Sequence, residues 1–360
     1  MSKSERGPIR VVVVDDSETA RSLLVAILQN AAGIEVVGTG STGEDAVELA
    51  RRLRPDVISM DVVMPRMNGL EATQHIMRET PTPIVIVAGT GTWAAQDLTF
   101  RALRAGALTV VRKPGLSDPE TCDKVVQTIR LMASVPVVHH WRAATEDRPH
   151  GAPEVPLAAW EGVAGRDIRV IGIASSTGGP SALAAVLGPL PADFPIPVLV
   201  VQHITPSFVV GLAAWLGRET PLRVSVAAHG DIAQPGTVLL APDGYHMQVN
   251  ARQVVELSKA PPYKGLRPSA NYLFRSMVRP YGPRALGVVL TGMGDDGAEG
   301  LEALHQAGGL TLAQDEESCV VYGMPREAAV RNAVDQVLSP AQISLALSEA
   351  AARRNAHRTP

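Results

Sequence analysis

The sequence predicts an α/β protein of two domains, and two observations lead to this prediction. First, short apolar runs alternate with amphipathic stretches over most of the 360 residues, as in parallel sheets covered by helices on both faces. Second, this pattern is lost over residues 135–166, where prolines and scattered charges indicate a linker. We therefore expect one domain at residues 8–134 and another at 167–350.

In the first domain, five apolar runs predict the strands of a five-stranded parallel sheet. The expected strands cover residues 9–17 (with the following loop), 34–40, 55–61, 82–89 and 107–114. Amphipathic stretches with helical spacing cover residues 19–31, 44–53, 69–78, 96–106 and 120–133. The strict strand–helix alternation predicts that helices cover both faces of this sheet.

The second domain repeats the alternation on a larger scale and predicts a doubly wound, mostly parallel sheet. Buried-strand patterns cover residues 168–174, 196–203, 284–292 and 310–315, and shorter strands are expected at 236–242 and 246–250. Helical spacing covers residues 180–190, 209–218 and 297–309, and a last helix is expected near the end of the chain.

Composition and charge exclude several classes of protein. Hydrophobic residues make up 46% of the chain, which is enough for a core in each domain, and the net charge of −3 supplies no basic field for nucleic acid. The polar N-terminus lacks the apolar core of a signal peptide, and no apolar run approaches the ~18 residues of a membrane span. Cys122 and Cys319 have no metal-type spacing. We expect a cytoplasmic protein that neither binds nucleic acid nor inserts into a membrane.

Charged side chains follow three strands of the first domain. Asp15 and Asp16 end the first strand, Asp61 ends the third and Lys113 ends the fifth. The carboxyl ends of parallel strands meet at one edge of a sheet, so these groups should lie close together. Crowded carboxylates repel one another unless a cation joins them, and Mg²⁺ prefers oxygen ligands of this kind.

The stretches "VVVVDDS", "MDVVMPRMNGLEA" and "RKP" make the first domain resemble the response-regulator receiver family, whose fold is flavodoxin-like. The resemblance implies that Asp61 accepts a phosphoryl group. It also implies an acidic pair of Asp15 and Asp16, with Asp16 the more direct Mg²⁺ ligand. Lys113 would contact the phosphoryl group, and the backbone carbonyl of Val63 would complete the metal site.

This resemblance has two departures. Receivers usually have Thr or Ser directly after the fourth strand's apolar run, where this chain has Ala88. They usually have Tyr or Phe in the fifth strand, where this chain has Val110. Thr90 and Thr92 are near in sequence, and a substitute role for them stays open. The metal and acceptor residues are intact, whereas the residues that relay phosphorylation are altered.

In the second domain, the segment "VIGIASSTGG" has the spacing of a nucleophile elbow. Ser176 has Ala174 two residues before it and Gly178 two residues after it, and small flanking residues permit a sharp strand-to-helix turn. Centring the pattern on Ser175 would place Thr177 where the elbow needs Gly. The elbow therefore favours Ser176 as a nucleophile, and the alternative is a serine that only caps the helix.

A nucleophilic serine needs a base and an acid that orients this base. His203 ends a buried strand directly after the serine's strand–helix unit, which places it on the same sheet edge. His246 follows a weaker strand, and His305 lies within a helix. The segment "GMGDDG", which follows a buried strand, contains Asp295 and Asp296 as candidate acids.

One competing motif is the segment Gly292 to Gly297, which matches the dinucleotide pattern G-x-G-x-x-G and is followed by Asp315. Two adjacent carboxylates in this loop would repel a pyrophosphate. The fingerprint also belongs in the first strand–helix turn of a domain, whereas this segment comes late. We therefore expect no dinucleotide site.

Six stretches make the second domain resemble the catalytic domain of chemotaxis protein-glutamate methylesterases, a family of receiver-linked response regulators. They are "SSTGGPSAL", "VQHITPSF", "APDGYHM", "RPSANYLF", "VVLTGMGDDGAEGL" and "CVVYGMPREA". The resemblance implies a triad of Ser176, His203 and Asp296. Ala174 stands where relatives usually have Gly, and Asn271 stands where many have Asp.

The resemblance implies a phosphorylation-regulated hydrolase that removes methyl esters from glutamyl side chains and deamidates glutamine. The backbone N–H groups of Thr177 and Met293 would hold the oxyanion. Neither route needs a metal, so Mg²⁺ is expected only in the receiver. The implied partners are methyl-accepting chemoreceptors as substrate and a chemotaxis histidine kinase as phosphodonor. The alternative function is a receiver-controlled adaptor with a relic esterase domain.

Overall fold

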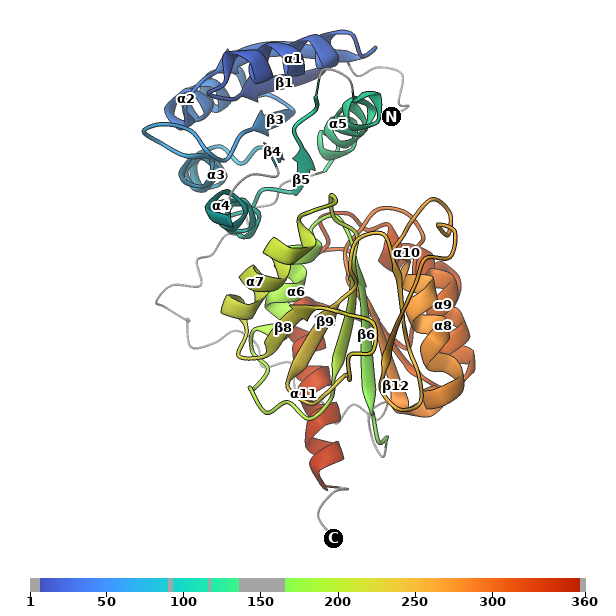
Figure 1. Ribbon diagram of the computed structural model, residues 1–360. Coiled ribbons are helices and arrows are strands. Elements are labelled where there is room, and N and C mark those ends of the chain that lie inside the picture. Colours follow the sequence, from blue (N-terminus) through green and yellow to red (C-terminus); the bar gives the residue numbers. More distant parts are fainter. Residues whose placement is uncertain (1–6, 90–92, 116–117, 136–165, 357–360) are drawn as a thin grey trace. The chain divides into compact units, whose positions relative to one another are not determined.

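The computed structural model describes residues 7–89, 93–115, 118–135 and 166–356 (Figure 1). The chain divides into two compact units, Met1–Glu146 and Asp147–Pro360. The expected linker falls almost wholly outside the described residues, and the finer boundaries 8–134 and 167–350 stay predictions.

The first unit contains the predicted five-stranded parallel sheet, with strand order β2-β1-β3-β4-β5. Its strands are β1 (Ile9–Val14), β2 (Ile34–Gly40), β3 (Val57–Met60), β4 (Ile84–Ala88) and β5 (Thr109–Arg112). Its helices are α1 (Glu18–Gln29), α2 (Gly43–Leu53), α3 (Gly69–Glu79), α4 (Trp93–Arg104) and α5 (Pro119–Met132). Helices α1 and α5 cover one face of the sheet, and α2, α3 and α4 cover the other (Figure 1).

Local sequence explains where these elements begin. Val11–Val14 of β1 are buried on both faces, as expected for a central parallel strand. The side chain of Ser17 accepts a hydrogen bond from the first turn of α1. Helix α2 begins with a capping box formed by Thr42 and Asp45.

The second unit is built on a seven-stranded sheet of order β14-β13-β12-β6-β7-β9-β8, in which every pairing is parallel. Its strands are β6 (Val170–Ser175), β7 (Val198–Gln202), β8 (Arg223–Val226), β9 (Thr237–Leu240), β12 (Ala285–Val289), β13 (Leu310–Gln314) and β14 (Gln336–Leu338). A separate antiparallel pair consists of β10 (His246–Val249) and β11 (Val255–Ser258). The doubly wound, mostly parallel fold predicted from the sequence is confirmed.

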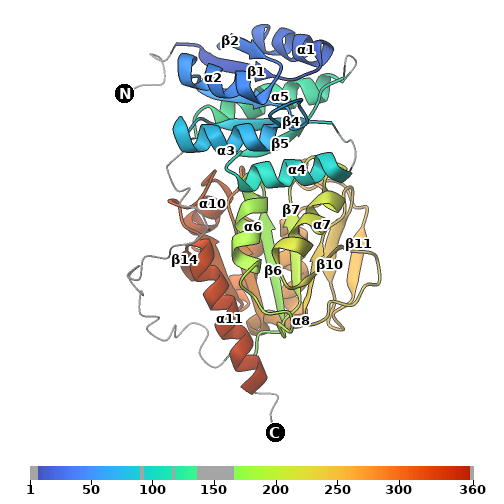
Figure 2. The same ribbon diagram turned by 90° about the vertical axis from the view of Figure 1, so that its left-hand side faces the viewer.

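Helices cover both faces of this sheet (Figures 1 and 2). On one face lie α6 (Gly179–Leu187), α7 (Val209–Glu219) and α11 (Pro340–Ala356), and on the other lie α8 (Ala270–Tyr281), α9 (Ala298–Gln306) and α10 (Met324–Val330). Five elements were not expected from the sequence, namely β8, β11, β14, α8 and α10. The first three are only three or four residues long, which is too short for a periodic signal.

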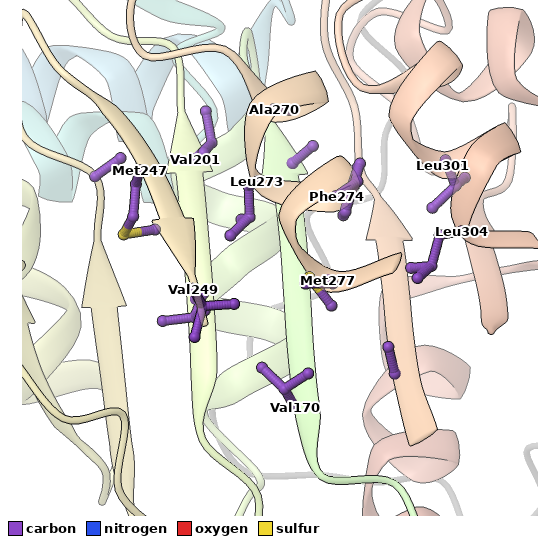
Figure 3. Close-up of a cluster of buried hydrophobic side chains, with 14 of the residues drawn as sticks. Val170, Val201, Met247, Val249, Ala270, Leu273, Phe274, Met277, Leu301 and Leu304 are labelled. Carbon is purple, nitrogen blue, oxygen red and sulfur yellow. The ribbon is translucent and has the colours of Figure 1, made fainter. Parts of the chain in front are cut away.

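Helix α8 forms much of the core on its face of the sheet (Figure 3). Leu273, Phe274 and Met277 are fully buried and point from α8 toward the sheet. A Cβ on Gly172 of β6 would lie 2.8 Å from the Met277 sulfur, so a larger residue at this strand position would require the Met277 side chain to shift.

The sequence predicts that no segment of the chain spans a membrane, and the helices of the structure bear on this prediction. Over the residues that the structure describes, no helix combines the length and the apolar character needed to cross a membrane.

Candidate functional site

Three neighbouring strands of the second unit deliver the predicted triad residues. Strands β12, β6 and β7 are adjacent and parallel, so their carboxyl ends share one edge of the sheet. Ser176 follows β6, His203 follows β7, and Asp296 lies in the loop between β12 and α9. This edge is the place where ligands bind in open α/β sheets.

The structure separates the two adjacent serines. Ser175 is the last residue of β6; it is fully buried, and its hydroxyl donates to Oε1 of Gln202 at 2.7 Å. Ser176 lies in the turn after the strand and is only partly buried. Among the described residues, the Ser176 hydroxyl has no hydrogen-bond partner. The N-cap of α6 is Gly178, so the alternative that Ser176 caps this helix is wrong.

Two glycines allow the turn to form. Gly178 has a φ of +79°, and a Cβ there would lie 2.6 Å from the side chain of Val320. Gly292, in the loop after β12, comes so close that a Cβ would lie 2.7 Å from the Cβ of Ser176. The "GMGDDG" loop therefore packs against the serine turn, and this use argues against the dinucleotide interpretation.

His203 and Asp296 contact each other. Nε2 of His203 lies 2.9 Å from Oδ2 of Asp296, and the side chains are 13% and 3% exposed. The distance is that of an ion pair, but the N–H direction is too far off line for a hydrogen bond. Catalytic contacts often align only when substrate is bound. The described residues include no hydrogen bond between His203 and the Ser176 hydroxyl.

The N-terminus of α8 holds the Asp296 carboxylate. Oδ1 accepts from the Ser269 hydroxyl at 2.6 Å and from the Asn271 amide at 2.8 Å, while Oδ2 accepts from the Ala270 N–H at 2.6 Å. Burial works to raise the pKa of Asp296, but His203 and these donors outweigh it, so the pKa lies below its ordinary value. Asp296 is therefore an anion with a fixed orientation.

The second candidate acid, Asp295, has a different environment. Its side chain is 41% exposed and lies 2.6 Å from Nζ of Lys264. The two neighbouring aspartates thus point to different partners, and the structure brings only Asp296 to His203.

The two other histidines considered as bases, His246 and His305, occupy structural positions. His246 is fully buried and stacks on Tyr272 with ring centroids 3.8 Å apart. Its Nδ1 accepts from the Ser269 N–H, and its Nε2 lies 3.1 Å from the Pro261 carbonyl, so both ring nitrogens are occupied. Burial lowers its pKa and favours the neutral imidazole. His305 lies on α9, with Nδ1 3.2 Å from the Thr311 hydroxyl.

The predicted oxyanion donors lie in the two loops that meet at Ser176. Thr177 directly follows Ser176, and Met293 follows Gly292, with a side chain that is 57% exposed. Among the described residues, neither backbone N–H has a hydrogen-bond partner. Both groups are therefore free to donate, and their role stays a prediction.

Sequence reasoning missed Gln202 and Ser269. Both side chains hydrogen-bond to a triad residue or its turn, yet neither residue type belongs to a catalytic pattern. The only sequence signal for Gln202 is its place at a strand end, directly before His203.

The receiver site has the predicted groups together. Carboxylate oxygens of Asp15, Asp16 and Asp61 lie within 4.8 Å of one another. Nζ of Lys113 lies 2.7 Å from Oδ2 of Asp15 and 2.7 Å from Oδ2 of Asp61. The three carboxylates supply hard oxygen ligands of the kind that Mg²⁺ prefers, and they fit such an ion. Val63 lies two residues after Asp61, with a side chain that is 50% exposed.

Electrostatics in this cluster follow from its burial. Burial raises the pKa of Asp61 most, the Asp15 charge adds to the rise, and the hydrogen bond from Lys113 offsets part of it. Burial works to lower the pKa of Lys113, but the hydrogen bonds to Asp15 and Asp61 outweigh it and raise this pKa. The ammonium is therefore held in its charged form beside the predicted phospho-acceptor.

The two receiver departures are buried in the fold. Ala88 ends β4 and is 2% exposed, and Val110 in β5 is 7% exposed. Neither side chain has a hydroxyl to donate. Thr90 and Thr92, for which a substitute role was left open, lie outside the described residues.

Comparisons with known proteins agree with both halves of the chain. A family model described as CheB methylesterase matches residues 171–347, and one described as response regulator receiver domain matches residues 11–126. A Myxococcus xanthus relative, named protein-glutamate methylesterase/protein-glutamine glutaminase 4, is 46% identical over 95% of this chain and 97% of its own length. The chain belongs to the CheB methylesterase family.

Two further matches support membership in the CheB methylesterase family. A Syntrophus aciditrophicus relative, named protein-glutamate methylesterase/protein-glutamine glutaminase 1, is 43% identical over 94% of this chain and 97% of its own length. The crystal structure of the Thermotoga maritima CheB methylesterase catalytic domain matches with 34% identity and a TM-score of 0.50, over 51% of this chain and 98% of that chain. None of these findings favours the alternative of a relic esterase domain.

Proposed function

We propose that this chain hydrolyses glutamyl methyl esters of methyl-accepting chemoreceptors, with Ser176 as nucleophile, His203 as general base and Asp296 as the acid that orients the base. One observation carries the proposal. A serine with a free hydroxyl and a histidine paired with a buried aspartate follow three adjacent parallel strands at the same sheet edge. The names of the relatives supply the ester and amide substrates.

The proposed proton positions are based on the contact between His203 and Asp296. Because Nε2 of His203 lies 2.9 Å from the Asp296 anion, we propose that the neutral imidazole keeps its proton on Nε2 and that substrate binding brings this N–H into line with the carboxylate. Nδ1 then carries the lone pair that accepts the Ser176 proton as Oγ attacks the ester carbonyl. Nδ1 later returns a proton to the leaving methoxide, and water repeats the sequence to release glutamate.

The oxyanion of each tetrahedral intermediate needs donors that are already in place. The N–H groups of Thr177 and Met293 are unbonded among the described residues and lie in the loops around Ser176, so we assign this role to them. A glutamine side chain would pass through the same acyl-enzyme with ammonia as the leaving group. The esterase chemistry as proposed uses these residues alone and takes no cofactor.

In the receiver, we propose that Asp61 accepts a phosphoryl group from a chemotaxis histidine kinase. Mg²⁺, held by Asp15, Asp16, Asp61 and the Val63 carbonyl, would screen the negative charge at this site. The ammonium group of Lys113 lies 2.7 Å from carboxylate oxygens of both Asp15 and Asp61, and after phosphorylation it would contact the phosphoryl oxygens. We place the chain in the cytoplasm with its substrate helices, acting without nucleic acid and without entering the membrane.

Methanol release from a methylated receptor fragment tests the proposal. The chain should release methanol, and Ser176→Ala should lose on the order of 10⁶-fold in kcat, as expected for a triad nucleophile. Ser175→Ala is the matched control, because it removes the adjacent hydroxyl and should cost far less. An inactive wild-type chain, or an active Ser176→Ala variant, would contradict the proposal.

A further inference from the structure

The side chain of Gln202 lies between the serine turn and the histidine turn. Gln202 is the last residue of β7, and only 5% of it is exposed. Its Oε1 accepts from the Ser175 hydroxyl at 2.7 Å. Its Nε2 donates to the Ser176 carbonyl at 2.7 Å and to the His203 carbonyl at 2.8 Å. One amide therefore bonds to the backbone of both proposed catalytic residues.

The orientation of this amide is fixed by its partners. The carbonyls of Ser176 and His203 can only accept, so the NH₂ group must face them and both of its N–H donors are used. Oε1 then faces Ser175, whose hydroxyl must donate. This explains why Ser175 is a buried hydroxyl residue although it is not the nucleophile.

Gly179 makes room for the amide. A Cβ at Gly179 would lie 2.0 Å from Oε1 of Gln202 and 2.9 Å from the Cβ of Ser175, so only glycine leaves this space. The Gly179 N–H also donates to the Ser176 carbonyl at 2.8 Å, which thus accepts two hydrogen bonds. Ser175, Gly179 and Gln202 form one interlocked group.

The position of this group at the end of the sheet gives it a specific task. The pairing of β6 with β7 ends at Ser175 and Gln202, and the last ladder bond runs from the His203 N–H to the Ser175 carbonyl at 2.9 Å. Beyond this bond the two chains diverge into their turns. The Gln202 amide extends the cross-strand connection by one residue on each side, to the carbonyls of Ser176 and His203.

We infer that Gln202 is a positioning residue that sets the separation between the nucleophile and the base. The inference rests on the catalytic roles proposed above for Ser176 and His203. A misplacement of about 1 Å between reacting groups can cost on the order of 10²-fold in rate. Loss of both Nε2 donors should release the two turns from each other and produce a loss of this size.

Gln202→Glu is the sharpest variant, because it keeps the shape of the side chain and the acceptor for Ser175. It replaces the NH₂ group with an oxygen that faces two carbonyls. We expect kcat for methanol release to fall on the order of 10²-fold with KM unchanged. The rate at which a fluorophosphonate labels Ser176 should fall by a similar factor, since labelling also needs an aligned base.

Gln202→Met is the second variant and covers a failure of Gln202→Glu to fold. It has a similar length and no charge, and it also removes both donors, so the same fall in kcat per folded molecule is expected. Thr220→Val serves as a control for stability alone, because the Thr220 hydroxyl is buried and donates to the Leu187 carbonyl at 2.9 Å outside the site. It should lower the melting temperature and leave kcat unchanged.

The outcomes separate this inference from the proposed function. A wild-type chain that neither releases methanol nor reacts with the fluorophosphonate overturns the proposed function, and the inference with it. An active wild-type chain whose folded Gln202 variants keep their kcat and labelling rate overturns the inference alone. If the folded Gln202 variants lose kcat with KM unchanged, and Thr220→Val keeps its kcat, the inference is supported.

Discussion

Replacing Asn271 with aspartate tests how the Asp296 carboxylate is held. The amide of Asn271 donates to Oδ1 of Asp296 at 2.8 Å, while its own Oδ1 accepts from the Gly300 N–H at 2.6 Å. The Gly300 donor fixes the amide orientation, so Nδ2 must face Asp296. Asn271→Asp keeps the size of the side chain and the bond from Gly300, but it turns the donor into a second carboxyl group.

The magnitude follows from the geometry. A hydrogen bond to a charged group contributes about 1.5–3 kcal/mol, and this contribution is lost once the new carboxyl group ionises. Two carboxylates this close cannot both ionise easily, so the pKa of one of them is raised strongly. A carboxyl group whose pKa is higher in the folded protein than in the unfolded chain stabilises the fold at pH values below its unfolded pKa. This stability is lost as the pH rises through its folded pKa. The stability gap to the wild-type protein should therefore widen from about pH 4 upward.

In the wild-type protein, the contribution of Asp296 to stability depends on pH with the opposite sign. Its pKa is lowered in the fold, so its contribution to stability is present above the unfolded pKa and is lost as pH falls through the folded pKa. In the variant, the second carboxyl group competes for charge with Asp296 and weakens the anion that orients His203. The kcat/KM for methanol release should therefore fall, and its pH profile should differ from that of the wild-type protein.

Urea unfolding across pH and the kcat/KM profile for methanol release measure the two effects. The control is Asn250→Asp, because Asn250 also donates to a carboxylate, Oε1 of Glu256, at 2.8 Å, but at an exposed site. Exposed charges interact weakly, so this variant should change stability by less than about 1 kcal/mol. An Asn271→Asp protein with wild-type stability and a wild-type pH profile would refute the reasoning.

Three further predictions concern the triad and the receiver. His203→Gln and Asp296→Asn should each impair methanol release severely, and the double variant should be no worse than about the worse single one, since the residues act as a unit; losses that multiply would contradict this. Asp61→Asn should abolish Mg²⁺-dependent labelling by a small phosphodonor, and label that persists would move the acceptor elsewhere. Ala88→Thr combined with Val110→Tyr should enlarge the activation of methanol release by a phosphodonor. The restored charge-assisted hydrogen bond contributes about 1.5–3 kcal/mol, which is about tenfold or more in the equilibrium between the two receiver states. An unchanged response would show that the switch lies elsewhere.

The sequence was sufficient to predict the framework of the protein. Apolar strand runs alternating with amphipathic helices set both parallel sheets, because the hydrophobic pattern is local and repeats along the chain. The same pattern predicted which side chains follow strand ends, and the ends of parallel strands must share an edge. The candidate residues Ser176, His203 and Asp61 could therefore be named in advance.

Other features depended on contacts between distant segments. The neighbours Asp295 and Asp296 are equivalent in the sequence, and only the docking of α8 against the sheet gives one of them the donors that fix it as an anion. The sequence left His246 as a lesser candidate for the base. The structure stacks its ring on Tyr272 and occupies both of its nitrogens.

The sequence by itself determined the fold class, the strand ends and the chemical types of the candidate residues, because periodicity and turn residues act over a few positions. Only the tertiary structure showed that Ser175, and not Ser176, uses its hydroxyl in a buried hydrogen bond. It also showed that Gln202 bonds to the turns of both Ser176 and His203. These choices depend on donors and acceptors that lie 26 or 27 residues apart in the chain, and such pairs form only when β6 and β7 come together in register.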